Sequence, residues 1–101
     1  MTARAYPDLL ELDLSGPVGR VTLARPAKRN ALCDALVLAL RDVFETLPKH
    51  VNAVVLDSQG PHFCAGLDLS EMEDHDVPGG VLHSRMWHAA FERIQFGRVP
   101  V

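Results

Sequence analysis

The sequence has no apolar run that approaches the roughly 20 residues needed by a membrane-spanning helix. Its first residues, MTARAYPDLLELDL, lack the apolar segment that is typical of a secretory signal. Only two cysteines are present, Cys33 and Cys64, which favours reduced thiols over a disulfide framework. Lysine and arginine are scattered and the net charge is −3, so no basic stripe indicates nucleic-acid binding. These features predict a cytoplasmic protein whose partners include neither a membrane nor a nucleic acid.

The first third of the chain has the pattern of two strands joined by a short turn. Leu10, Leu12 and Leu14 alternate with polar residues, which predicts a half-buried strand. Residues 15–17 (SGP) form the turn, and residues 18–24 form a second strand before Arg-Pro interrupts it. With 101 residues and 48% hydrophobic content, the chain is one domain at most, with a thin core.

The apolar period then changes from that of a strand to that of a helix. Residues 32–47 place leucine, alanine and valine at helical spacing, and Pro48 ends this helix. Residues 53–56 (AVVL) are an unbroken apolar run, typical of a parallel strand covered on both faces. Strand, helix and strand make a βαβ unit with a right-handed crossover. A mobile acidic loop is expected over residues 71–80, followed by a second helix over residues 81–95.

The last five residues, GRVPV, predict a helix stop followed by the first residues of a further strand. A strand that starts at Val99 has no partner or loop after it within the 101 residues. The sequence therefore predicts part of a longer architecture.

Three blocks of the sequence resemble successive blocks of one known family. They are VGRVTLARPAKRNAL, AVVLDSQGPHFCAGLDLSEM and WHAAFERIQFGRVPV. Together they make residues 9–101 similar to the crotonase superfamily, which includes enoyl-CoA hydratases and isomerases. The resemblance implies an α/β fold, a crotonase-like spiral of ββα units, of which residues 1–101 form the incomplete N-terminal portion.

The resemblance also implies an acyl-CoA thioester as substrate, a place in fatty acid metabolism, no covalently bound cofactor and no metal. Family members assemble as trimers or pairs of trimers. Their second oxyanion donor and catalytic glutamates lie beyond the strand that starts here at Val99, so the 101 residues alone are expected to show no hydratase turnover. Two hypotheses stay open: an enoyl-CoA hydratase/isomerase family enzyme, or a non-catalytic remnant that assembles with other chains and at most binds acyl-CoA weakly.

By this resemblance, the segment HFCAGLDL carries the first oxyanion donor, which is the backbone N–H of Leu67. Fixed dipoles aimed at developing charge stabilise an enolate strongly in a water-excluded site. Gly66 is expected because a Cβ there would obstruct the thioester carbonyl. The structural alternative is a tight turn that packs on the neighbouring strand. Asp68 and Leu69 follow as substrate-binding residues, although Asp68 also suits a cap or a loop-ordering role.

The segment around Lys28 and Arg29 is the second candidate. Two adjacent cations near a helix start suit the phosphates of CoA, and the resemblance places the backbone of Ala31 and Ala65 near the adenine. A solvated basic turn is the alternative. Cys33 stands where helix caps usually carry serine or asparagine, so the cap is weak unless Asn30 or Asp34 compensates.

Trp87 and His88 are the third candidate, because a Trp-His pair at the matching place lines the acyl pocket in related aryl-CoA dehalogenases. His88 would then be a base near neutral pH. Packing of Trp87 in the core, with His88 at its edge, is the favoured alternative. A zinc site that combines His62 and Cys64 with other histidines has no supporting spacing. Cys64 suits a small buried residue better than a nucleophile.

Overall fold

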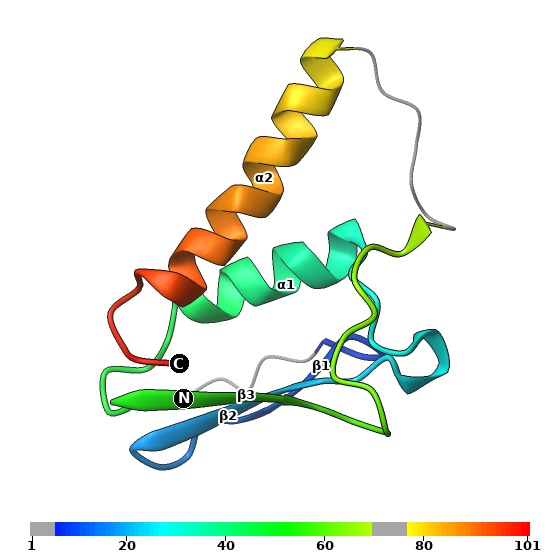
Figure 1. Cartoon of the computed structure of the whole chain (residues 1–101). Coiled ribbons are helices and arrows are strands. Elements are labelled where there is room, and N and C mark those ends of the chain that lie inside the picture. The colour runs from blue at the N-terminus through cyan, green and yellow to red at the C-terminus, as the bar shows by residue number, and fades with distance from the viewer. Residues whose placement is uncertain (1–5, 70–76) are drawn as a thin grey trace.

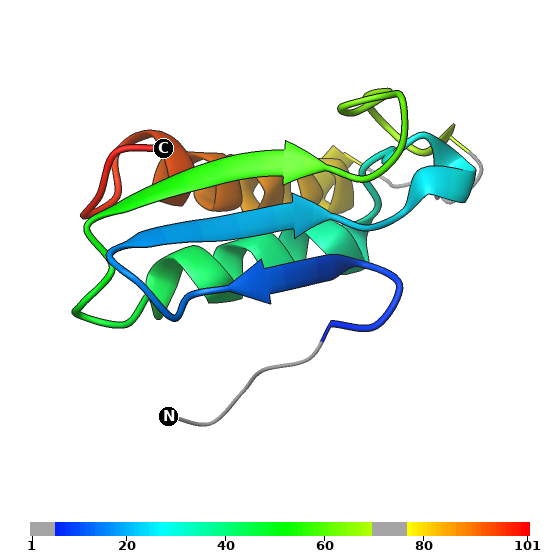
Figure 2. The same cartoon turned by 90° about the horizontal axis from the view of Figure 1, so that it is seen from below.

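The computed structural model describes residues 6–69 and 77–101, which form a three-stranded sheet with two helices on one of its faces (Figures 1 and 2). Strand β1 (Leu10–Asp13) pairs antiparallel with β2 (Val18–Leu23), and β2 pairs parallel with β3 (Ala53–Ser58). The strand order is β1-β2-β3. The predicted strands and the βαβ unit are confirmed.

The register of β1 and β2 follows the alternation of apolar residues. Leu10 lies opposite Leu23 and Leu12 lies opposite Val21, so one face of the pair is apolar throughout. Val21 and Leu23 are buried on this face. The opposite face of the sheet carries Arg20 and other polar residues.

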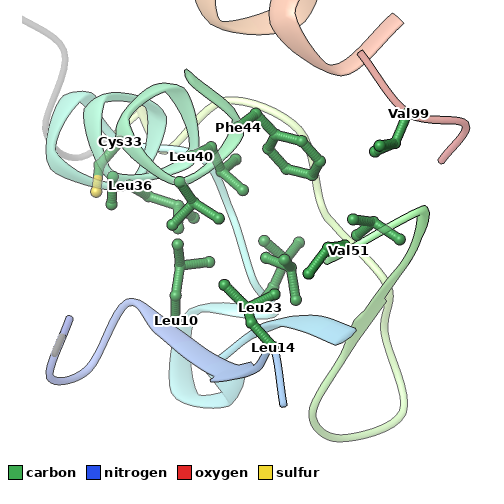
Figure 3. Packing of buried hydrophobic residues seen from close by; sticks show 13 residues of the cluster. Leu10, Leu14, Leu23, Cys33, Leu36, Leu40, Phe44, Val51 and Val99 are labelled. Atoms are coloured by element: carbon green, nitrogen blue, oxygen red, sulfur yellow. The ribbon is translucent and has the colours of Figure 1, made fainter. Parts of the chain in front are cut away.

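Helix α1 (Asp34–Glu45) packs its apolar stripe against the inner face of the sheet (Figures 1 and 3). The buried side chains of the stripe are Leu36, Val37, Ala39, Leu40, Val43 and Phe44. The helix is shorter at both ends than the predicted range of 32–47. Leu32 pairs with another loop instead, and Thr46 forms the C-cap. Cys33 is the N-cap and makes no side-chain capping bond, while Asp34 places a carboxylate in the first turn, where the helix dipole favours it.

Strand β3 extends two residues beyond its predicted end and is covered on one face only within the described residues (Figure 2). Val54 is buried, whereas the neighbouring Val55 is 44% exposed. The expectation of cover on both faces is therefore wrong for this structure. An apolar run shows that a strand can be buried, but the covering layer comes from elsewhere in the chain or assembly.

Helix α2 (Val77–Gln95) crosses α1 on the side away from the sheet (Figure 1). It begins four residues before the predicted start at Val81, so the loop expected over residues 71–80 is wrong for 77–80; residues 71–76 lie outside the described residues. The early start includes Pro78, which the first turn of a helix tolerates because the N–H that proline lacks would have no intrahelical partner there. No described helix has the length and apolarity that crossing a membrane requires.

The residues after α2 return to the sheet without forming a strand. Val99 is buried in the core cluster, where it approaches Val51 (Figure 3). The Val54 N–H donates to the Pro100 carbonyl at 2.9 Å. The N–H of the preceding residue, Ala53, points to the opposite side of the strand, where β2 pairs with β3. Pro100 therefore lies at the outer edge of β3, where the predicted strand would begin.

Candidate functional site

Two loops leave the carboxyl ends of the parallel strands β2 and β3 and meet at that edge of the sheet. The first, residues 24–33, leads from β2 into α1, and the second, residues 59–69, follows β3. Carboxyl ends of neighbouring parallel strands lie together, which is where open α/β sheets place ligands. The loops contain every candidate residue of the first two predicted groups.

The two loops are joined by an isolated parallel bridge between Leu32 and Leu67. The Leu32 N–H donates to the Gly66 carbonyl at 2.7 Å, and the Asp68 N–H donates to the Leu32 carbonyl at 2.8 Å. In such a bridge the central residue, Leu67, turns its own N–H and C=O away from the partner segment. Within residues 6–69 and 77–101, no acceptor is found for the Leu67 N–H.

Gly66 adopts a backbone conformation that L-residues disfavour, with φ of +89°. A Cβ built on Gly66 would meet no atom within 4 Å, so the space beside it is open. The glycine is therefore needed for its positive φ, and the open space agrees with an approach by another molecule. The Gly66 N–H faces the Cys64 sulfur at 3.4 Å, so the thiol contacts the backbone of its own loop.

Asn30 is fully buried and holds the two loops together. Its Oδ1 accepts from the Arg25 N–H, and its Nδ2 donates to the carbonyls of Gln59 and His62, each at 2.8 Å. Asn30 and the preceding Arg29 are both left-handed, with φ of 57° and 53°. Asparagine tolerates this conformation better than most residues, so Asn30 meets both the backbone and the hydrogen-bonding demands of the position.

Arg25 and Asp68 form a buried ion pair across the same two loops. The Arg25 Nη2 lies 3.0 Å from the Asp68 Oδ2, and their side chains are 10% and 6% exposed. The other guanidinium nitrogen, Nη1, donates to the Ala31 carbonyl. The ion pair agrees with the loop-ordering role expected for Asp68, while its cap and substrate-binding roles stay predictions.

The remaining residues of the predicted nucleotide site lie next to the loop that carries Leu67. Lys28 ends the 3₁₀ turn Pro26–Lys28, and both Lys28 and Arg29 are exposed. The Ala65 N–H donates to the Arg29 carbonyl at 3.1 Å, which sets the two candidate groups side by side. Ala31 is buried and Leu69 is exposed beyond the bridge.

Trp87 and His88 lie on α2, and Leu32 of the first loop packs against the cluster that contains Trp87. Trp87 is buried against Val37 and Ala90, and its Nε1 donates to the Asp34 carboxylate at 2.9 Å. His88 is exposed. This placement agrees with the alternative in which Trp87 is a core residue.

Two other expectations concern open space and metals. One hollow of about 580 Å³ lies beside Phe44 and Arg98, and another of about 620 Å³ lies beside Tyr6 and reaches the first residues of the two loops, Ala24 and Gln59. Neither includes Leu67, so a cleft at its N–H stays a prediction. Among the described residues, no three or more His, Cys, Asp or Glu side chains come together as a metal site would require.

Arg25 and Asn30 are the residues that sequence reasoning missed. The sequence pattern predicts only that Arg25, with Pro26, ends a strand. Their partners are 29 to 43 positions away for the bonds that join the two loops, so no local pattern identifies these contacts. The left-handed preference of asparagine is a weak signal for Asn30 within a loop.

A family model described as enoyl-CoA hydratase/isomerase matches residues 13–101. A solved structure of a candidate enoyl-CoA hydratase from Rhodopseudomonas palustris is 46% identical, with a TM-score of 0.90, and the match covers 100% of this chain and 39% of that one. A candidate enoyl-CoA hydratase from Rhizobium meliloti is 31% identical over 96% of this chain and 37% of its own length. The predicted fold class is confirmed.

A candidate enoyl-CoA hydratase from Thermobifida fusca has been solved in complex with CoA and with acetoacetyl-CoA. In the CoA complex it is 30% identical, with a TM-score of 0.74, over 87% of this chain and 37% of that one. The acetoacetyl-CoA complex gives a TM-score of 0.69 at 30% identity, over 86% and 37% of the two chains. The chain thus spans less than two-fifths of these relatives, with shares of 37% to 39%.

Proposed function

Because the chain belongs to the enoyl-CoA hydratase/isomerase family, we propose that its two carboxyl-end loops bind an acyl-CoA thioester and stabilise its enolate. The observation that carries the proposal is the Leu67 N–H, which the Leu32–Leu67 bridge turns away from its partner segment and which has no acceptor among the described residues. A fixed and unused backbone donor beside open space is the arrangement that oxyanion stabilisation requires.

The chemistry follows from where charge develops in an enoyl or acyl thioester. Addition of water to the double bond, or loss of a proton next to the carbonyl, moves an electron pair onto the thioester oxygen. A donor already fixed at that oxygen stabilises the charge without reorganisation, an effect of roughly 3 kcal/mol per donor in acyl-transfer sites. Leu67 contributes its backbone N–H to this role, and its side chain adds only to the shape of the site.

The nucleotide of CoA is proposed to lie along Lys28 and Arg29. Both side chains are exposed, and the bond from Ala65 N–H to Arg29 carbonyl places them beside the loop that carries Leu67. An extended ligand with phosphates at one end and a thioester at the other suits this arrangement of cations and donor. The CoA and acetoacetyl-CoA complexes of the Thermobifida fusca relative support the proposed ligand class.

A titration of the purified 101-residue chain with acetyl-CoA tests this function directly. We expect saturable binding that weakens as salt is raised, because exposed cations meet phosphates. Addition of crotonyl-CoA tests turnover in the same sample. Absence of acetyl-CoA binding at low salt would contradict the proposal.

One observation favours a second candidate, in which the chain binds acyl-CoA without catalysis and assembles with other chains. The outer face of the sheet exposes Val18 and Val55, and Phe96 is exposed after α2. Exposed apolar groups of this kind favour contact with another polypeptide. Binding without turnover, together with self-association in sedimentation, would support this candidate; a monodisperse monomer would oppose it.

A further inference from the structure

We infer that Arg25 is a positioning residue for the Leu67 N–H, acting as a clamp across the Leu32–Leu67 bridge. The inference deepens the function proposed above and rests on it. Arg25 would touch neither the thioester nor the nucleotide. It acts through the two loop segments that it joins.

The geometry of the clamp is given by the two arms of the guanidinium group. One arm, Nη1, donates to the carbonyl of Ala31, which directly precedes Leu32. The other arm, Nη2, lies 3.0 Å from the carboxylate of Asp68, which directly follows Leu67. Arg25 therefore grips both strands of the bridge immediately beside its central pair.

The bridge needs such support because it is short. Outside the bridge, the two segments do not continue as a regular ladder. Displacement of a positioned group by about 1 Å can cost a hundredfold in rate, so a donor on a short bridge must be fixed from outside. Charge-assisted bonds from a planar guanidinium give both strength and direction, which a lysine ammonium cannot reproduce.

The clamp also has an electrostatic consequence. The Asp68 carboxylate belongs to the residue next to Leu67 and is 6% exposed. Without a cation beside it, this buried negative charge would oppose the charge that gathers on a thioester oxygen at the Leu67 N–H. Arg25 neutralises the carboxylate at the same time as it holds the loop.

The test compares binding of acetyl-CoA with binding of S-ethyl-CoA, an analogue that lacks the carbonyl oxygen. The wild-type chain should prefer acetyl-CoA by about three- to tenfold, the range of one hydrogen bond. Arg25→Met should reduce this preference to less than about twofold. The ratio of the two affinities is the readout, because any loosening of the loop at Ala31 affects both CoA compounds alike. Arg25→Lys, which reaches one partner at a time, should lie between them.

Arg20→Met is the matched control. Arg20 also pairs with an aspartate, Asp57, at 3.4 Å, but the two side chains are 61% and 37% exposed. This change should leave the preference for acetyl-CoA intact. All variants are compared at a temperature where circular dichroism shows them folded, and Arg25→Lys carries the test if Arg25→Met does not fold.

A second measurement works without ligand. In ¹⁵N-labelled protein, Arg25→Lys should shift the amide signals of Gly66, Leu67 and Asp68, whereas Arg20→Met should leave them in place. Unmoved amide signals, or an Arg25→Met variant that is less stable but keeps the full preference for acetyl-CoA, would overturn the clamp. A wild-type chain that binds neither CoA compound would instead overturn the proposed function, and the amide signals would still decide whether Arg25 positions the loop.

Discussion

The two ends of the β2–β3 pair are stabilised by different kinds of contact. At the amino ends of the strands, Gly19 lies against Leu14, Val51 and Val54, and Val99 packs nearby (Figure 3). At the carboxyl ends, polar groups are buried as well: an asparagine with three side-chain hydrogen bonds and an arginine–aspartate pair. Among the described side chains, no buried nitrogen or oxygen lacks a hydrogen-bond partner.

The two ends of the strand pair should therefore respond differently to substitution. Apolar contacts depend mainly on volume, so the amino end should accept substitutions that preserve size. Buried hydrogen bonds depend on direction and on complete pairing, so the carboxyl end should reject substitutions that preserve size but change a donor into an acceptor. The loop geometry that the proposed donor requires is therefore maintained where substitution is least tolerated.

The largest expected contrast comes from near-isosteric changes at the two ends. Asn30→Asp replaces the two donors to Gln59 and His62 with an acceptor and should lower the free energy of unfolding by about 3 kcal/mol at pH 7. Leu14→Met at the amino end should cost less than about 1.5 kcal/mol. Urea denaturation followed by circular dichroism measures both values.

The exposed Asn52 provides the control, because Asn52→Asp should change stability by less than about 0.5 kcal/mol. Equal losses for Asn30→Asp and Leu14→Met would remove the distinction between the two ends. The Asn30→Asp loss should shrink as pH falls towards about 4, because burial beside two carbonyls raises the pKa of the new carboxyl and its protonated form can donate one bond.

The cost of replacing glycine by alanine gives a second comparison of the two ends. Gly19→Ala should cost about 1–3 kcal/mol through overpacking, because the new Cβ would lie 2.8 Å from a Leu14 methyl carbon. Gly66→Ala has open space but a φ of +89°, so its cost of about 1 kcal/mol comes from the backbone. Thermal unfolding reports both.

Gly16→Ala is the neutral reference, since a Cβ at Gly16 would meet no atom within 4 Å and its φ lies outside the left-handed region. Enlarging Gly66 further to valine should also suppress acetyl-CoA binding, because the side chain would enter the approach of the thioester. Full binding by Gly66→Val would contradict an open approach beside that residue.

At the carboxyl end, the exposed cations should matter to the ligand but not to the fold. The double change Lys28→Ala and Arg29→Ala should weaken acetyl-CoA binding by about tenfold and reduce its salt dependence, with little change in stability. Lys49→Ala combined with Arg85→Ala removes the same charge from exposed positions elsewhere. Isothermal titration at two salt concentrations compares the pairs, and equal affinities for both double variants would remove Lys28 and Arg29 from the nucleotide site.

The smallest expected effect concerns Glu45, which links the two helices. Hydrogen bonds from Arg41 and then Arg93 lower the pKa of Glu45 below its ordinary value of 4.5. A lowered pKa means that this contribution to stability is present above pH 4.5 and is lost as pH falls through the lowered value. Glu45→Gln should therefore show a slightly weaker loss of stability than wild type on acidification below pH 4.5. Identical acid profiles would show that the link adds nothing measurable.

The sequence was sufficient to predict the strands, their order along the chain and helix α1, because each has a local apolar period. It was insufficient for the cover of β3, since the exposure of a strand depends on elements that are distant in the sequence. It was also insufficient for the start of α2, since Pro78 is compatible with the first turn of a helix. The Gly66–Leu67 loop was found by resemblance. Arg25 and Asn30, which support this loop, were missed because their hydrogen bonds to it form only when the two loops meet.

We propose that the Leu67 N–H, and not the Leu67 side chain, binds the thioester oxygen. An ester in place of the Gly66–Leu67 amide removes this N–H and leaves the side chain unchanged, and Cys64 offers a junction for chemical ligation of residues 64–101 to the rest. The ester also weakens the bond from Leu32 N–H to Gly66 carbonyl, and this change affects the binding of acetyl-CoA and S-ethyl-CoA alike. The readout is therefore the ratio of the two affinities. We predict that the about three- to tenfold preference for acetyl-CoA disappears in the ester protein and survives in Leu67→Ala. A preference retained in the ester protein and lost in Leu67→Ala would contradict the account.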